Sequence, residues 1–259
     1  GSAMSGSNTT TTSDVLNFGT SANGLASGTI TVSGNVSSGN ITFGSASGNI
    51  TLSGGNITLA GNITSSGASA GITHTITSNI TLSGATRQFG NNNNQRFIFT
   101  GVIGGSSNLQ ADTSNGAGAI TLNGTNTFTG NFAVTRGQVN FNSLANAGQN
   151  SALGAGSVIT AGGGGGQTPY FWYTGVGSAS SNRTWNLQGS GTTITAQNGS
   201  LLLSGTFNGV SNFDSNIYLT GTADTGTNEI SGVIANAPAG FNTHITITNS
   251  APQGGSTEA

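Results

Sequence analysis

The stretch Asn79-Ile80-Thr81-Leu82-Ser83-Gly84 decides the fold, because the chain repeats it with small variations. Apolar residues at alternate positions have the period of a β-strand with one buried face, and the Ser-Gly pair that follows ends the strand in a turn. No segment has a long apolar stripe with helical spacing, so the sequence predicts an all-β protein. Variants of the phrase occupy residues 40–44, 49–54, 56–61 and 119–124.

Alternation also predicts which side chains form the core. The apolar residues of each strand face inward, and the Thr and Asn residues between them face solvent. Residues 142–154 are richer in Ala and Leu, but we expect an irregular loop there rather than a helix. We expect inward-facing pairs at Ile80/Leu82, Phe97/Phe99, Ile120/Leu122, Phe132/Val134, Val139/Phe141, Trp185/Leu187, Leu201/Leu203 and Ile217/Leu219.

Many short strands also occur in antiparallel sandwiches and barrels. We favour a parallel β-helix, a β-solenoid in a single elongated domain, because equivalent residues of its successive turns stack. Asn and Thr can then form hydrogen-bonded ladders, and Ile and Leu can form aliphatic ones. Gly and Asn also tolerate the left-handed backbone that tight corners require. At about 20 residues per coil, the ordered part would form about 11–12 coils.

A coarser repetition is present as well. Residues 78–84 (SNITLSG) return at residues 215–221 (SNIYLTG), and residues 99–103 (FTGVI) return at residues 230–234 (ISGVI). The shared order and similar separation predict one full copy of a long unit within a longer array of repeats.

Composition excludes several classes of function. The 259 residues include 45 glycines and only 4% charged residues, against about a quarter in ordinary globular proteins. There is no lysine, and four dispersed arginines offer no basic surface to nucleic acid or to an anionic membrane. The absence of Cys excludes disulfides and thiol chemistry. With so few ionisable groups, we expect stability to be insensitive to pH.

The two ends of the chain differ from its centre. Residues 1–4 (GSAM) are typical of a cloning remnant, and the Ser/Thr/Asn run that follows has no apolar side chain. We therefore expect residues 1–13 to be this remnant and a disordered leader, residues 14–251 to be the β-helix, and residues 252–259 to be a flexible tail. No apolar run has the length of a membrane-spanning helix.

Serine and histidine motifs are weak. Residues 67–71 (GASAG) match the G-x-S-x-G pattern close to His74, but a nucleophile elbow requires a strand-to-helix turn in an α/β sheet, so we interpret them as a plain turn. His74 and His244 occupy solvent-facing positions of Thr-rich strands and lack nearby partners for a metal site. We therefore predict no catalytic, cofactor-binding or metal-binding residue.

The acidic residues Asp112, Asp214, Asp224 and Glu229 would support polysaccharide cleavage only if they converged in the folded rod. The sequence itself shows no acidic cluster. Arg183 stands near Trp185, and we expect it to hydrogen-bond loop carbonyls rather than to act on a ligand.

Residues 169–173 (PYFWY) form an aromatic strand. Alternation turns Phe171 and Tyr173 inward and leaves Tyr170 and Trp172 as an outward pair. Outward rings either stack between coils or bind a sugar or a partner protein. Tyr170 and Trp172 are therefore the candidate binding residues.

Residues 99–103, 118–130 (GAITLNGTNTFTG), 132–134 and 137–141 (GQVNF) follow one another in a fixed order. Together they resemble the autotransporter-associated β-strand repeat, and weaker matches continue through residues 152–154, 173–175 and 182–187. The resemblance implies a right-handed β-helix of the passenger type. It also implies secretion and display on a bacterial surface, with anchoring in the outer membrane through parts outside this chain.

The sequence thus predicts a non-enzymatic structural or adhesive segment of a secreted or cell-surface bacterial protein. Expected partners are glycans or surface proteins of another cell and neighbouring repeats of the same longer chain, without nucleic acid, membrane insertion or cofactors. A polysaccharide-acting β-helix enzyme is one alternative. An ice-binding solenoid is another, suggested by Thr-x-Thr triplets, although their irregular spacing argues against a flat ice-binding face. The triplets are residues 29–31, 73–75, 193–195 and 246–248.

Overall fold

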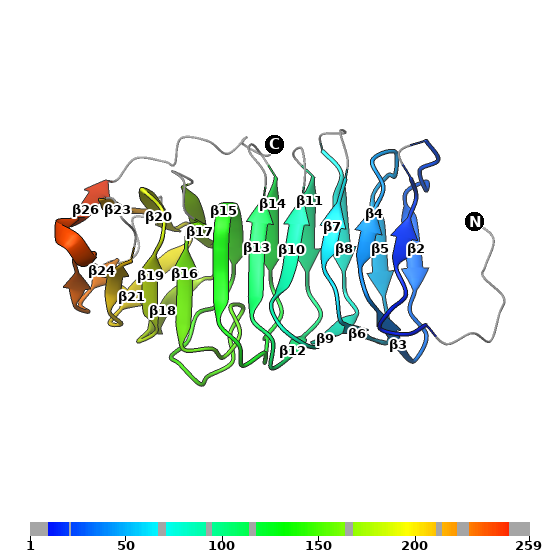
Figure 1. Cartoon of the computed structure of the whole chain (residues 1–259), viewed down its shortest axis with the longest axis horizontal. Coiled ribbons are helices and arrows are strands. Elements are labelled where there is room, and N and C mark those ends of the chain that lie inside the picture. Colours follow the sequence, from blue (N-terminus) through cyan, green and yellow to red (C-terminus); the bar gives the residue numbers. More distant parts are fainter. Residues whose placement is uncertain are drawn as a thin grey trace.

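A computed structural model describes residues 10–20, 22–66, 71–91, 95–113, 118–163, 168–210, 214–221 and 228–248. The expected 1–9 part of the leader and the 252–259 tail lie outside these ranges. The described chain is an all-β parallel solenoid, with strands stacked along its long axis (Figure 1). The described helical structure is the 3₁₀ turn η1 (Pro238–Gly240), and no described helix has the length and apolar character needed to cross a membrane.

The strands form three faces, which we name A, B and C, and the chain passes through them in this order. Face A consists of β1 (Leu16–Phe18), β4 (Ile41–Phe43), β7 (Ile63–Ser65), β10 (Arg87–Asn91), β13 (Leu109–Thr113), the first part of β15 (Phe132–Phe141), β16 (Val158–Ala161), β19 (Thr184–Leu187), β22 (Phe207–Gly209) and β25 (Ile234–Ala235). Face B consists of β2 (Gly28–Thr31), β5 (Ile50–Ser53), β8 (Thr73–Ile76), β11 (Arg96–Phe99), β14 (Ala119–Leu122), the second part of β15, β17 (Pro169–Tyr173), β20 (Gly191–Ala196), β23 (Ser215–Gly221) and β26 (Thr243–Thr248). Face C consists of β3 (Asn35–Ser38), β6 (Asn56–Leu59), β9 (Asn79–Leu82) and β12 (Ile103–Gly105), and farther along of β18 (Gly177–Ser181), β21 (Gly199–Leu203) and β24 (Glu229–Ile230).

The turns are longer than the sequence suggested. Partners on adjacent strands of face A are 22 residues apart at Ile41 and Ile63 and 27 residues apart at Phe132 and Ile159. Faces A and B each stack ten described strands, with β15 shared between them. The expected 11–12 coils of about 20 residues are therefore wrong, because three faces and their corners need more chain per turn.

The core fills the interior from turn to turn. All eight predicted inward-facing pairs are buried, so alternation is confirmed as the guide to the core. Aromatic rings continue the packing from one turn, or level, of the solenoid to the next. Trp185 stacks on Phe207 at 5.5 Å between ring centroids and meets Phe171 edge-on at 5.0 Å. Burial of these rings in one continuous column stabilises each turn through its neighbours.

Polar ladders join the turns on the outside, as expected. On face C, Asn56 Nδ2 donates to Asn35 Oδ1 at 2.8 Å, and Asn79 Nδ2 donates to Asn56 Oδ1 at 3.2 Å. On face B, the hydroxyls of Thr195 and Thr220 lie 2.6 Å apart. The repeated Asn of the strand phrase therefore links one turn to the next.

Glycine is required where corners of adjacent turns touch. An added Cβ at Gly205 would lie 1.8 Å from the carbonyl oxygen of Arg183, and one at Gly232 would lie 1.8 Å from the carbonyl oxygen of Gly205. Only glycine allows this close backbone approach.

The two long sequence copies do not occupy equivalent places. Residues 78–84 contain β9 of face C, whereas residues 215–221 coincide with β23 of face B. The structural unit is therefore the single turn, and the longer similarity follows from strands and corners of similar composition.

Candidate functional site

Asp112 forms a local polar cluster on face A. Its carboxylate pairs with the Arg136 guanidinium one level farther along, and it accepts a 2.9 Å hydrogen bond from Gln88 Nε2 one level back. These contacts join three successive turns. We interpret the cluster as a structural ion pair on the surface.

The other described acids lie far from Asp112. Asp214 precedes β23, four levels beyond β13, which is about 19 Å at the usual strand spacing. It faces His244 Nε2 at 3.8 Å, while Glu229 is exposed on face C. The two carboxyl groups of a glycoside hydrolase lie about 5–10 Å apart, so Asp112 and Asp214 do not form such a pair. Asp224 lies outside the described residues.

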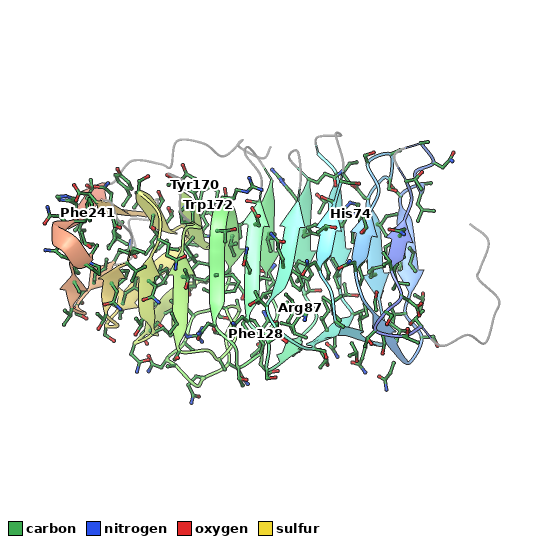
Figure 2. All side chains as sticks on the ribbon, viewed as in Figure 1. His74, Arg87, Phe128, Tyr170, Trp172 and Phe241 are labelled. Atoms are coloured by element: carbon green, nitrogen blue, oxygen red, sulfur yellow. The ribbon has the colours of Figure 1, made fainter. Side chains whose placement is uncertain are left out.

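His74 does not face solvent, and that prediction is wrong. In β8 the inward pair is His74 and Ile76, so the imidazole is fully buried, stacks on Phe43 at 4.2 Å between centroids and accepts a 3.4 Å hydrogen bond at Nδ1 from the Ile50 N–H. Burial lowers its pKa to about 4, although a hydrogen bond with Gln95 opposes this. His74 is therefore neutral near pH 7 and serves as a core residue (Figure 2).

Of the remaining histidine and serine predictions, one is confirmed and the other falls on residues that the structure does not describe. His244 is exposed, as expected, and residues 67–70 of the G-x-S-x-G motif lie outside the described residues. Among the described residues, no three His, Asp or Glu side chains gather as metal ligands.

Arg183 binds loop carbonyls, as predicted. Its Nη1 donates to the Leu153 carbonyl at 2.9 Å, and its Nη2 donates to Gln149 at 3.1 Å, to Gly154 and to Ser151 Oγ at 3.2 Å. Burial lowers the pKa of the guanidinium to about 10, so it stays charged at neutral pH. Its role is structural.

The aromatic strand β17 follows the predicted alternation. Phe171 and Tyr173 are buried, whereas Tyr170 and Trp172 face outward and are half-buried. Figure 2 shows these two side chains together at the outer margin of the ribbon. The candidate binding pair is therefore on the surface of face B.

Tyr218 extends this pair, which the sequence alone did not indicate. It points outward from β23 and is 37% exposed, and its ring lies against β20, where a Cβ on Gly191 would meet Tyr218 Cε2 at 3.3 Å. The outward threonines of β20 are buried, with Thr193 8% and Thr195 2% exposed. Alternation around Ile217 and Leu219 predicts that Tyr218 faces outward. Its alignment with Tyr170 could not be predicted, because the loops between the strands differ in length. We call Tyr170, Trp172 and Tyr218 the aromatic patch.

Register fixes the geometry of the aromatic patch. Tyr170 pairs with Thr193, which pairs with Tyr218, so the two tyrosines occupy one row, two levels apart. Trp172 lies in the neighbouring row, above Thr195.

Polar side chains continue both rows away from the patch. Gln138 and Asn140 precede Tyr170 and Trp172 by one level, and Gln138 Nε2 donates to Asn140 Oδ1 at 2.7 Å. Thr246 follows Tyr218. The row from Gln138 to Thr246 thus carries uncharged side chains.

The Thr-x-Thr triplets all lie on face B despite their irregular spacing. Thr29, Thr51 and Thr75 share one outward row, and Thr246 pairs with Tyr218. Corner loops of different length absorb the spacing, so that argument against ice binding does not hold. Bulkier residues, the aromatic patch among them, nevertheless interrupt the threonines.

No family model, no curated protein and no solved structure matches the chain. Function must therefore be inferred from the fold and its surface.

Proposed function

We propose that this chain is a structural and adhesive segment of a secreted or surface-displayed bacterial protein. It acts as a β-solenoid stalk and binds glycans or surface proteins of another cell through the aromatic patch. The observation that carries this proposal is the outward position of three aromatic rings on face B, where Tyr170 and Trp172 are half-buried and Tyr218 is 37% exposed. Exposed clusters of apolar rings are typical of interaction surfaces.

The stalk role is supported by the continuity of the solenoid. Backbone ladders and the core column link every described level to the next, which suits a stiff spacer. Ile245 and Ile247 of β26 occupy inward register positions but are 36% and 74% exposed. These side chains suit packing against neighbouring repeats of a longer chain.

A polysaccharide-cleaving enzyme is less well supported. The described acids lie on different faces or several levels apart, and Asp112 is engaged by Arg136. The low charge, the absence of Cys and the resemblance of residues 99–141 support display at a bacterial surface.

The test replaces Tyr170 and Trp172 together by Ser and measures adhesion of the purified protein to cells and glycan arrays. We expect at least a tenfold loss of binding, because outward rings supply contact area to a partner. The melting temperature should change little, since both rings lie outside the core.

The matched control is Val102→Ser, which removes an exposed apolar side chain elsewhere and should leave adhesion intact. Equal adhesion of the double variant and the wild type would contradict the adhesive role. Polysaccharide turnover that is lost in Asp112→Asn or Asp214→Asn would overturn the non-enzymatic one.

A further inference from the structure

The spacing of the aromatic patch restricts its ligand. Tyr170 and Tyr218 share one row with Thr193 between them, so their Cα atoms lie two strand spacings, or about 9.5 Å, apart along the solenoid axis. Because the backbone ladders fix this interval, the two tyrosines are attached to the sheet at preorganised positions.

The local packing holds Tyr218 against the sheet. Gly191 has no side chain, and the Tyr218 ring lies against the backbone of β20 at this point. One side of the ring is thus supported, while the residue remains 37% exposed. A ring supported in this way can stack against a flat apolar surface of a ligand.

We propose that the aromatic patch binds a neutral β-1,4-linked polysaccharide chain laid along the solenoid axis, with alternate sugar rings on Tyr170 and Tyr218. This proposal rests on the adhesive function above and names its ligand class. In an extended β-1,4-linked chain each ring is turned over relative to the previous one, so alternate rings present the same face. Their repeat is close to the length of two strand levels. An α-1,4-linked chain curves and cannot follow a straight row.

The surroundings fit an uncharged, hydroxyl-rich ligand. Gln138 precedes Tyr170 in the row and Thr246 follows Tyr218, so polar groups flank the stacking rings. Arg96 occupies the same row three levels before Tyr170 and is therefore not part of the aromatic patch. Trp172 stands beside Tyr170 in the adjacent row and can contact the side of the same sugar ring.

The experiment titrates the whole chain with cellohexaose and with the corresponding β-1,4-linked hexamer of N-acetylglucosamine by isothermal calorimetry. Maltohexaose serves as the α-1,4-linked probe. We expect one of the β-linked hexamers to bind at least tenfold more tightly than maltohexaose. Tyr170→Ser and Tyr218→Ser should each weaken that binding at least tenfold, and Val102→Ser should not change it.

A further variant separates ligand stacking from coverage of Gly191. Tyr218→Leu still covers the glycine but lacks a flat ring, whereas Tyr218→Phe keeps the ring. We expect Phe to retain binding and Leu to lose it, with both melting temperatures close to wild type. Chain length gives a second criterion, because a trisaccharide reaches both tyrosines and a disaccharide does not. The gain from disaccharide to trisaccharide should disappear in Tyr218→Leu.

The proposal is overturned if neither β-linked hexamer binds, if maltohexaose binds equally well, or if Tyr218→Leu binds like wild type. Loss of cell adhesion in the aromatic variants, without binding of either β-linked hexamer to the wild type, would refute this ligand assignment and leave the adhesive function standing. Binding of a β-linked hexamer without adhesion to cells would support the ligand assignment and contradict the adhesive function.

Discussion

At the scale of single residues, His74 shows how burial changes a titratable group. Its imidazole stacks on Phe43 and makes a tilted contact with Phe97, and burial lowers its pKa to about 4. This histidine changes the expectation of pH-insensitive stability that low charge suggested, because the unfolded chain binds a proton that the folded core excludes.

The free energy of unfolding should therefore fall in mild acid. The unfolded His74 has an ordinary pKa of 6.5 and the folded one a pKa of about 4. Stability is complete above pH 6.5 and declines as the pH drops towards 4, by roughly 3 kcal/mol in total. Urea unfolding at a series of pH values measures this decline.

Two variants control that measurement. His74→Phe keeps a ring of similar size in the stack, so the acid-dependent loss between pH 6.5 and 4 should vanish even if stability at neutral pH falls. His244→Gln, at an exposed position, should leave the profile unchanged. A pH profile of His74→Phe identical to wild type would refute the assignment.

At the scale of elements, an irregular segment takes the place of a face C strand in the turn before β18. Residues 143–156 lie there, and the end of β18 holds them together with the corner that follows: Ser181 Oγ donates to the Ala145 carbonyl at 3.0 Å, and the Ala147 N–H donates to Asn182 Oδ1 at 2.9 Å. Arg183 completes this attachment from inside. The Arg183 guanidinium, with several donors in a fixed geometry, thus replaces the backbone hydrogen bonds that join strands elsewhere on face C.

Replacing Arg183 by Met should destabilise the protein by about 3 kcal/mol or more, because several buried acceptors lose a charged donor at once. Arg183→Lys should recover little, since one ammonium cannot reach the same acceptors. Arg136→Met removes a surface ion pair and should cost less than about 1 kcal/mol. Chemical denaturation compares the three variants, and equal effects of Arg183→Met and Arg136→Met would show that the buried network contributes nothing special.

At the scale of the whole molecule, the stacked levels produce a rod (Figure 1). Each level contacts chiefly its neighbours, so length grows with the number of turns while the cross-section stays constant. This geometry places the two rows of the aromatic patch parallel to the long axis.

Small-angle scattering of the protein should accordingly give the profile of an elongated particle. Far-UV circular dichroism should show β-structure with negligible helix, because the described helical content is confined to one short 3₁₀ turn. A globular scattering curve or a strong helical signal would contradict the solenoid.

The sequence by itself determined the fold class and the core. Two-residue alternation is a local property of a strand, so Phe97, Trp185 and Ile217 could be placed inside and Tyr170 and Trp172 outside without knowing any neighbour. Arg183 could likewise be assigned to loop carbonyls, since the planar guanidinium suits several acceptors.

Only the tertiary structure decided which strands meet. Corner loops of unequal length shift the register of each turn, so the row shared by Tyr170 and Tyr218 and the common face of the threonine triplets could not be read along the chain. The prediction for His74 was wrong because a histidine between two threonines can face either side of a strand. In the folded protein the imidazole packs against Phe43 and therefore faces inward. Which residues of two turns meet depends on the total number of residues in the loops between them, and a local alternation pattern does not specify that number.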